Sequence, residues 1–410
     1  MKSYNQYLAE ADANLHMTHL EDAVIDGGVK GTRNVINYIR NIRDMLSGNT
    51  KAPVSLTTKW DGAPAIFAGV DPADGKFFVA KKGVFNKTPK LYKTNAEIDN
   101  DLSGDLNSKF KVALKEFAKL GIEGVVQGDF LYTDDDLKTE NIDGEPCVTF
   151  HPNTIVYAVP KTSSLGKKIS GSKIGVVWHT TYSGSTLETM SASFGMAIST
   201  KLNNVKSVWH VDATFEDKSG TATMTKAETD NLTAMLSKAG SLFRTIDAKV
   251  LGELGTNEDL NVKVNTFINT KVRAGERIGS VKPFVADLQR YIQQYYQKEA
   301  DKRKTPAGKK TQMDKAAAVL QIFDKRNTKK LEAIFTLYDL FVDMKYVIIA
   351  KLDTVEGIRT LLKTKKGFEV TGQEGFVAID HYSSNALKIV DRMGFSLANF
   401  SDKYIKGWQK

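Results

Sequence analysis

Thr57-Thr58-Lys59-Trp60-Asp61-Gly62 is the most informative stretch of this sequence. It continues a β-type segment that begins at Pro53, and it ends in a turn-forming Asp-Gly pair. A lysine in this setting can attack phosphorus if nearby cations or a metal ion destabilise its ammonium group. Gly62 leaves room for a phosphate beside the turn. The alternative interpretation is a solvated lysine before a β-turn, so the other members of a site must be sought along the chain.

Length and composition describe an ordinary globular protein. The chain has 410 residues, of which 41% are hydrophobic and 26% charged, enough for two or three domains. No apolar run reaches membrane-spanning length and the first residues lack the apolar core of a signal peptide, so we expect no membrane partner. Cys147 is the only cysteine, which excludes an intrachain disulfide and favours a reducing, cytoplasmic location.

Positive charge is concentrated in one block. Residues 261–330 hold 17 Lys or Arg against 6 Asp or Glu, a net charge of +11 in a chain whose total is +9. Such a basic block indicates a polyanionic partner, and we expect nucleic acid. A solvated helical surface is the alternative, because lysine-rich helix faces are common.

The first 50 residues form a predicted N-terminal helical segment. Thr18-x-x-Glu21 has the pattern of a capping box, and the glycine-rich stretch 27–32 should break the segment into two helices. Lys30 and Arg33 would then lie at the start of the second helix, where free backbone N–H groups and the helix dipole can bind phosphate. A plain turn between helices is the alternative.

The predicted secondary structure of the rest of the chain changes twice. Residues 51–220 read as short strands separated by turns, 221–364 as helices, and 365–410 as strands again. This order predicts an α+β fold in which one mixed or antiparallel domain is interrupted by a large all-α insertion. Two independent domains followed by a tail are the alternative.

Further short motifs follow the lysine in a fixed order. They are Lys81-Lys82-Gly83, Val125–Leu131 around Asp129, Ile155–Val159 around Tyr157, Glu374-Gly375-Phe376-Val377, and Ala386–Val390 around Lys388. Together with Lys59-Trp60-Asp61-Gly62, this series resembles the covalent nucleotidyltransferase superfamily of polynucleotide ligases and messenger-RNA capping enzymes. The chain departs from that pattern in two places, since Asp129 replaces the usual Glu and the last strand has one lysine instead of two.

The resemblance implies a nucleotidyltransferase (ATP-grasp-like ligase) domain and a role for each matching residue. Lys59 would be the nucleophile, with Lys388 and Glu374 as further catalytic residues. The predicted nucleotide contacts are Asp61, Gly62, Lys82, Asp129, which would hold the ribose, and Tyr157, which would stack on the base; Lys30 and Arg33 are added from their helix start. ATP and Mg²⁺ (or Mn²⁺) would be the cofactors, with Glu374 and Asp129 as metal ligands. The alternative interpretation makes the two carboxylates turn or edge residues and Tyr157 a core residue.

The length of the chain after Lys388 bears on the type of enzyme. Only 22 residues follow, too few for the C-terminal oligonucleotide-binding barrel of capping enzymes and many DNA ligases. The resemblance therefore favours an ATP-dependent ligase that joins a 3′-hydroxyl to a 5′-phosphate of DNA or RNA through lysyl-AMP. It is similar in general appearance to ligase-like proteins of tailed phages, which would place it in the host cytoplasm, and we expect a monomer. A transferase of this fold with another acceptor and a non-catalytic nucleic-acid-binding protein remain alternatives.

Two expectations complete the sequence-based picture. Strand alternation places His179 and Val177 on one face, which favours a core or edge histidine over an acid or base. The whole interpretation also requires the Lys59 tip to lie within about 10 Å of Glu374 or Lys388, roughly one Debye length at 0.1 M salt.

Overall fold

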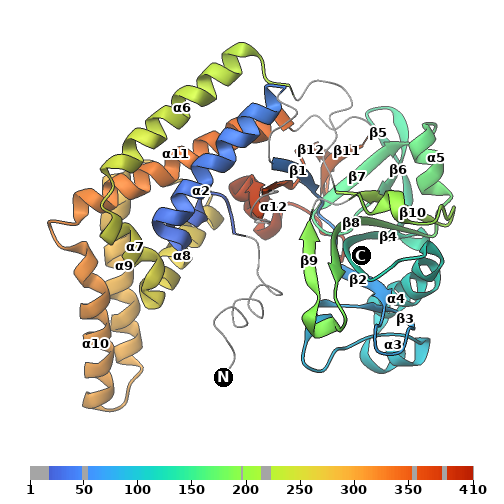
Figure 1. The fold of residues 1–410 in the computed structure, drawn as a ribbon, viewed down its shortest axis with the longest axis horizontal. Coiled ribbons are helices and arrows are strands. Elements are labelled where there is room, and N and C mark those ends of the chain that lie inside the picture. The colour runs from blue at the N-terminus through green and yellow to red at the C-terminus, as the bar shows by residue number, and fades with distance from the viewer. Residues whose placement is uncertain are drawn as a thin grey trace.

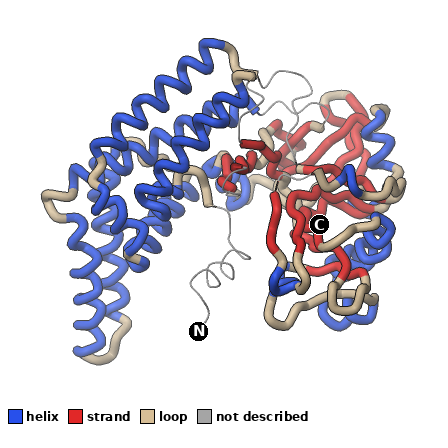
Figure 2. Tube along the Cα trace, viewed as in Figure 1, coloured by secondary structure: helices blue, strands red, loops and turns tan. Residues whose placement is uncertain are grey.

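The structure is a computed structural model that describes residues 18–48, 54–194, 197–213, 223–352, 358–380 and 386–409. Most of its helices lie on one side of the molecule and most of its strands on the other (Figures 1 and 2). All strand pairs except one are antiparallel, so the predicted α+β class is confirmed at this level. Residues 1–17 of the predicted N-terminal helical segment lie outside the described residues.

The helical side surrounds a long central helix. It contains α2 (Asp22–Leu46), α6 (Lys226–Thr245), α7 (Ala248–Thr256), α8 (Glu258–Arg273), α9 (Val281–Asp301), α10 (Pro306–Leu320) and α11 (Thr328–Leu352). Apolar residues recur around α11, and Phe335, Phe341 and Met344 are fully buried against its neighbours. A helix with so little polar surface is stable only when other helices cover it, which explains why α2 and α6 to α9 pack around α11.

Helix α2 has the predicted break but lacks the predicted cap. Gly28 has φ 54°, a backbone angle that glycine adopts without steric cost, and the helix bends there. Glu21 occupies the N-cap position without a side-chain cap, so the capping box expected for Thr18 and Glu21 is wrong. The reason is a long-range contact: the Glu21 carboxylate accepts a hydrogen bond from Lys345 of α11 at 2.6 Å.

A small sheet joins the two sides of the molecule. Its order is β1 (Val54–Lys59), β13 (Gly375–Asp380) and β14 (Ala386–Val390), all antiparallel. One face is apolar and packs on the helical core through Leu56, Phe376 and Ile389. Paired residues in adjacent antiparallel strands point to the same side, so the opposite face carries Lys59 and Lys388.

Two larger sheets form the strand-rich side. The first has the order β10 (Val208–Asp212), β8 (Ile174–Ser183), β4 (Val125–Thr133), β2 (Ala65–Val70) and β3 (Phe77–Ala80), with β9 (Ser191–Phe194) paired to β8. The second has the order β12 (Gly367–Val370), β11 (Arg359–Thr364), β7 (Ile155–Pro160), β6 (Glu145–Phe150) and β5 (Lys138–Ile142). Helices α3 (Asn95–Asp101) and α4 (Gly104–Phe117) cover one face of the first sheet, and α5 (Ser164–Ser170) contacts β6 and β7.

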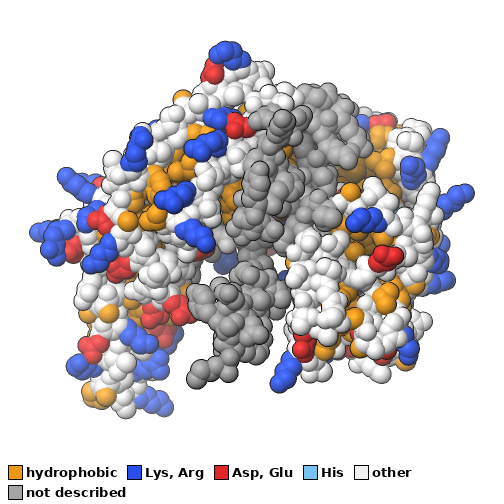
Figure 3. All heavy atoms as spheres, in the orientation of Figure 1, with side chains coloured by type: hydrophobic (Ala, Val, Ile, Leu, Met, Phe, Trp, Pro, Cys, Tyr) orange, Lys and Arg blue, Asp and Glu red, His pale blue; other side chains and the backbone are white. Residues whose placement is uncertain are grey.

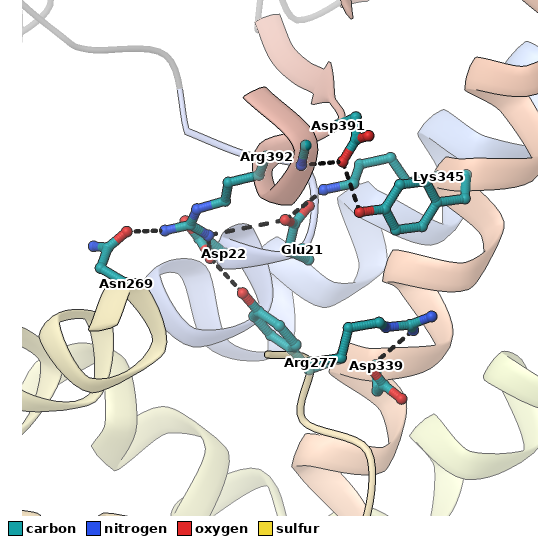
Figure 4. A network of polar contacts seen from close by, with 11 residues as sticks. Glu21, Asp22, Asn269, Arg277, Asp339, Lys345, Asp391 and Arg392 are labelled. Carbon is teal, nitrogen blue, oxygen red and sulfur yellow. Dashed lines mark hydrogen bonds and ion pairs between the residues drawn. The ribbon is translucent and has the colours of Figure 1, made fainter. Parts of the chain in front are cut away.

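A buried network of charges ties the small sheet to the helices (Figure 4). Arg392 opens α12 (Arg392–Phe400), directly after β14, and its guanidinium binds both carboxylate oxygens of Asp22 at 2.9 Å. Asp22 also accepts a hydrogen bond from Tyr338 at 2.7 Å, and Glu21 beside it binds Lys345. The helical side therefore fixes the end of the strand that carries Lys388.

Candidate functional site

Lys59 and Glu374 meet at the edge of the small sheet. Lys59 is the last residue of β1 and pairs with Gly375, the first residue of β13, so Glu374 lies directly beside it. Their side chains form an ion pair, with the Glu374 carboxylate buried and the lysine one-quarter exposed. The requirement that the Lys59 tip lie near Glu374 or Lys388 is thus confirmed, although Glu374 follows Lys59 by 315 positions in the sequence.

Lys388 lies on the same face of this sheet. It pairs with Val377, which in turn pairs with Thr57, two residues before Lys59. On its other side, the Lys388 backbone exchanges hydrogen bonds of 3.0 Å with Thr18 and Leu20. No described residue forms an ion pair with the Lys388 side chain, and burial together with the charge of Lys59 lowers its pKa.

The turn after Lys59 rests on the first large sheet. Ala63 donates its N–H to the Phe130 carbonyl at 3.0 Å, and Phe130 donates to the Pro64 carbonyl at 3.1 Å. A Cβ atom on Gly62 would lie 2.6 Å from the Cβ of Asp129, so only glycine allows this approach. The contact brings the lysine motif and the middle of β4 together, as the family resemblance implied.

Asp129 and His179 form the opposite wall of the site. Asp129 is in β4 and His179 in β8, and the histidine Nε2 lies 3.9 Å from a carboxylate oxygen of Asp129. Burial raises the pKa of Asp129, although the charges of Lys59 and Lys82 act in the opposite direction. Burial lowers the pKa of His179, whose Nδ1 contacts the Thr180 hydroxyl at 2.7 Å. The structure therefore places the partly buried His179 beside Asp129, at the candidate site.

The resting charge state of Lys59 differs from the expectation that cations lower its pKa. Burial acts in that direction, but the carboxylates of Glu374, Asp129 and Asp61 together outweigh it and raise the pKa of Lys59. Burial in turn raises the pKa of Glu374 to about 7 in spite of the lysine. The pair thus holds one proton tightly on the amine and leaves a carboxylate that can accept a proton near neutral pH.

Asp61 and Tyr157 support the site from behind instead of facing it. The Asp61 carboxylate accepts hydrogen bonds from the backbone N–H groups of Thr154 and Ile155 at 2.7 Å. The Tyr157 hydroxyl accepts the Asp61 N–H at 2.7 Å, and its ring is fully buried between Trp60 and Phe150. The prediction that Tyr157 stacks on a base is therefore wrong in this structure, because no face of the ring is accessible.

Three predicted cationic contacts separate into two groups. Lys82 begins a short 3₁₀ turn after β3, is exposed, and lies close enough to act on the pKa of Asp129 and of Lys388. Lys30 and Arg33 are exposed on α2, just beyond the bend where Gly28 lies against α7. No hydrogen bond or ion pair within the described residues joins them to Lys59, so they belong to the helical side.

The assembled side chains suggest phosphate chemistry. Three lysines, Lys59, Lys82 and Lys388, border two carboxylates, Asp129 and Glu374, at the junction of two sheets. Within the described residues no cluster of three or more His, Cys, Asp or Glu could hold a metal ion by itself. A divalent cation here would therefore need ligand oxygens from a bound phosphate, as Mg²⁺ commonly does.

His179 is the site residue that sequence reasoning did not assign. Alternation along β8 gave the correct face, but Val177 on the same face made the core interpretation more attractive. The register of β4 against β8 shifts between Gln127 and Gly128, which brings His179 beside Asp129. A local irregularity of this kind leaves no signature in the sequence of β8.

Comparison with known proteins gives a family and no activity. Residues 14–404 match a family described as a family of unknown function (DUF6267). No curated protein and no solved structure matches the chain. None of the helices in the part of the chain that the structure describes is long and apolar enough to cross a membrane.

Proposed function

We propose that this chain, which belongs to the DUF6267 family, is a covalent nucleotidyltransferase that acts as an ATP-dependent polynucleotide ligase. The observation that carries the proposal is the small sheet β1–β13–β14. It brings Lys59, Glu374 and Lys388 to one edge from distant parts of the chain, opposite Asp129. The two larger sheets and this edge would form the nucleotidyltransferase domain, and α6 to α11 its helical insertion.

The proposed first step is attack of the Lys59 amine on the α-phosphorus of ATP. A nitrogen–phosphorus bond forms, the bond from that phosphorus to the bridging oxygen breaks, and pyrophosphate leaves. Lys59 must first lose one proton to become a neutral amine, and Glu374, its ion-pair partner with a pKa of about 7, accepts that proton. The second proton, released as the nitrogen–phosphorus bond forms, leaves with the pyrophosphate. AMP held on Lys59 would then be transferred to a 5′-phosphate, and a 3′-hydroxyl would displace it.

Positive charge near the attacking amine is essential because a triphosphate repels nucleophiles. Lys388 and Lys82 are the cations that the described part of the site offers besides the nucleophile. The side chain of Lys388 has no ion-pair partner among the described residues, so it is available to a phosphate oxygen. We therefore assign phosphate binding to Lys388 and Lys82, and we no longer include Lys30 or Arg33.

A divalent cation fits the carboxylates of the site. Glu374 and Asp129 both lie near Lys59, and two carboxylates completed by phosphate oxygens are a usual environment for Mg²⁺ or Mn²⁺. When bound, the cation would polarise the phosphate that is attacked. Glu374 and Asp129 would hold it, and its charge would weaken the grip of Glu374 on the Lys59 ammonium.

The nucleoside would lie along the wall formed by β4 and β8. Asp129 has no hydrogen-bond donor among the described residues and is one-quarter exposed, so its carboxylate can accept from a ribose hydroxyl. His179 presents the aromatic ring beside it, and we assign to His179 the contact with the base that Tyr157 cannot make. The acceptor nucleic acid would be bound through the basic block 261–330.

Self-labelling tests the proposed function directly. Purified protein is incubated with α-labelled ATP or GTP and Mg²⁺, and the products are separated on a denaturing gel. We expect label on the protein band with ATP, stable to base and labile to acid as a phosphoramidate is. Lys59→Ala should abolish the label, while Lys173→Ala, which removes an exposed lysine bound to Asp134 at another edge, should retain it.

A panel of nicked duplexes then distinguishes a ligase from related enzymes. DNA or RNA is placed on each side of the nick, and a sealed product is expected for at least one combination. Self-labelling without sealing of any substrate would contradict the ligase assignment and favour a transferase with another acceptor. Nucleic-acid binding without self-labelling would contradict the enzyme assignment altogether.

A further inference from the structure

The helices α9 and α10 form an arm that projects from the helical side (Figure 1). Helix α10 packs on α9 and touches little else, whereas α9 also packs against α8 and α11, with Phe284 against Phe335. Only Ala316 and Val319 of α10 are buried, and every residue from Asp301 to Lys315 is exposed or partly buried. This segment adds little to the hydrophobic core, so packing alone does not explain its length.

The arm carries an excess of unpaired positive charge. Between Lys298 and Lys315 the sequence has seven Lys or Arg and three Asp or Glu. Lys302 pairs with Glu299 at 2.6 Å, and Lys310 pairs with Asp314 at 2.8 Å. The other cations have no ion pair among the described residues: Lys298, Arg303, Lys304, Lys309 and Lys315. They lie around the free end of the arm, where Figure 3 shows blue side chains.

Elsewhere in the basic block many charges are already neutralised within the protein. Arg277 binds Asp339 and Asp343, Lys330 binds Asp247, and Lys271 binds Glu276. Lys263 is buried beneath the ring of Tyr295 at 4.2 Å. The net charge of 261–330 therefore overstates the positive charge that is free to attract an anion. About half of the cations in this block that have no ion pair among the described residues lie in the arm.

We propose that the free end of the α9–α10 arm, residues 298–315, binds the phosphate backbone of a nucleic acid without reading its sequence. The inference extends the proposed function by placing its nucleic-acid contact on one segment. Flexible lysines bind phosphates as point charges, and a cluster of them suits a polyanion.

The composition of the arm argues against two other polyanionic surfaces. A membrane-binding helix needs an apolar face to insert, and Met313 is the single large exposed apolar side chain of α10 among the described residues. An interface with an acidic protein relies on a core that includes buried aromatic anchors, and the free end has no aromatic residue. A nucleic acid requires neither feature, since counterion release supplies most of its non-specific affinity.

Salt-dependent binding of a fluorescent 30-base-pair duplex to the full chain tests the inference. The arm variant combines Arg303→Gln, Lys304→Gln, Lys309→Gln and Lys315→Gln, which removes four unpaired charges and keeps both ion pairs. We expect the slope of log K against log salt to fall in magnitude by about 3 to 4, close to 0.9 for each charge removed. Affinity at 100 mM salt should fall about tenfold or more.

A matched variant controls for net charge. Lys167→Gln, Lys168→Gln, Lys201→Gln and Lys206→Gln remove four exposed lysines from the strand-rich side. We expect this control to keep a slope within about one unit of the wild type. Equal loss in the two variants, or no loss in the arm variant, would overturn the inference. Gln and Lys have similar helix propensity, and thermal unfolding would verify that both variants are folded.

Two further measurements separate this inference from its alternatives. Vesicles containing phosphatidylserine should bind the wild type more weakly than the duplex, and equal binding at equal salt would overturn the assignment to nucleic acid. The duplex comparison is repeated with Lys59→Ala in both variants, where no covalent chemistry can occur. Absence of self-labelling in the wild type would therefore defeat the proposed function while the salt slopes still decide on the arm.

Discussion

The molecule buries two clusters of charge, and they are built on opposite plans. In the network around α2, α11 and α12, each charge meets an opposite charge at 2.6 to 2.9 Å, as in Glu21–Lys345 and Asp22–Arg392. Around Lys59 the pairing is incomplete. Asp129 approaches only His179, at 3.9 Å, and Lys388 has no ion-pair partner among the described residues.

The difference distinguishes charges that stabilise the fold from charges that remain available to bind a ligand. A buried ion pair with good geometry is self-sufficient, whereas a buried charge without a partner is costly unless a ligand completes it. Burial raises the pKa of Glu374 to about 7 and lowers that of Lys388, while Lys345 helps to keep the pKa of Glu21 below its ordinary value. Asp129 and Lys388, which have no close ion-pair partner among the described residues, therefore distinguish the candidate site from the structural network.

Breaking an ion pair of the network around α2, α11 and α12 should have the largest effect on stability. Lys345→Met removes the partner of Glu21 and leaves a buried carboxylate unpaired, so the free energy of unfolding should fall by about 3 to 5 kcal/mol. Guanidinium unfolding followed by circular dichroism measures the change. The double variant Glu21→Leu with Lys345→Met removes both charges and should recover most of the loss. A double variant no more stable than the single one would show that the pair has another structural role.

The charges around Lys59 should instead give the stability of the protein an unusual dependence on pH. The raised pKa of Glu374 means that its contribution to stability is complete below 4.5, the unfolded value, and is lost as the pH rises through about 7. The loss amounts to about 3 kcal/mol. Glu374→Gln should remove this part of the slope between pH 4.5 and 7.5. Glu188→Gln, at an exposed position, should keep it, and identical slopes in both variants would contradict the assignment.

Lys388 should show the smallest effect on stability and a large one on chemistry. Because its pKa is lowered, the folded protein disfavours its charge, and Lys388→Met keeps the stem while removing that charge. We expect the free energy of unfolding to change by less than about 1 kcal/mol in either direction. Self-labelling by ATP should fall about 100-fold or more, the usual effect of losing one transition-state contact. A loss of stability as large as that of Lys345→Met would erase the contrast between the clusters.

What the sequence predicted well are features that depend on local pattern. Alternation of strands and helices gave the α+β class, and glycine composition gave the bend in α2. The motifs that resemble those of covalent nucleotidyltransferases also lie close together, with Lys59 beside Glu374 and Gly62 against Asp129.

What it missed are features that depend on contacts between distant segments. Glu21 fits a capping box by spacing, but a buried lysine 324 residues away competes for its carboxylate. Tyr157 lies on the predicted strand, yet the backbone N–H of Asp61 binds its hydroxyl and Trp60 covers its ring. Lys30 and Arg33 follow the predicted bend, and the direction in which that helix packs places them on the other side of the molecule.

The way β1, β13 and β14 are joined has a consequence for how the protein is made. A ribosome adding about 5 to 20 residues per second completes Lys59 roughly 15 to 60 s before Glu374 emerges behind it. During that interval the nascent chain holds the lysine without its partner strand, and no N-terminal fragment that stops short of Lys388 can complete the small sheet. The small sheet is thus completed only after helices α6 to α11 have been translated.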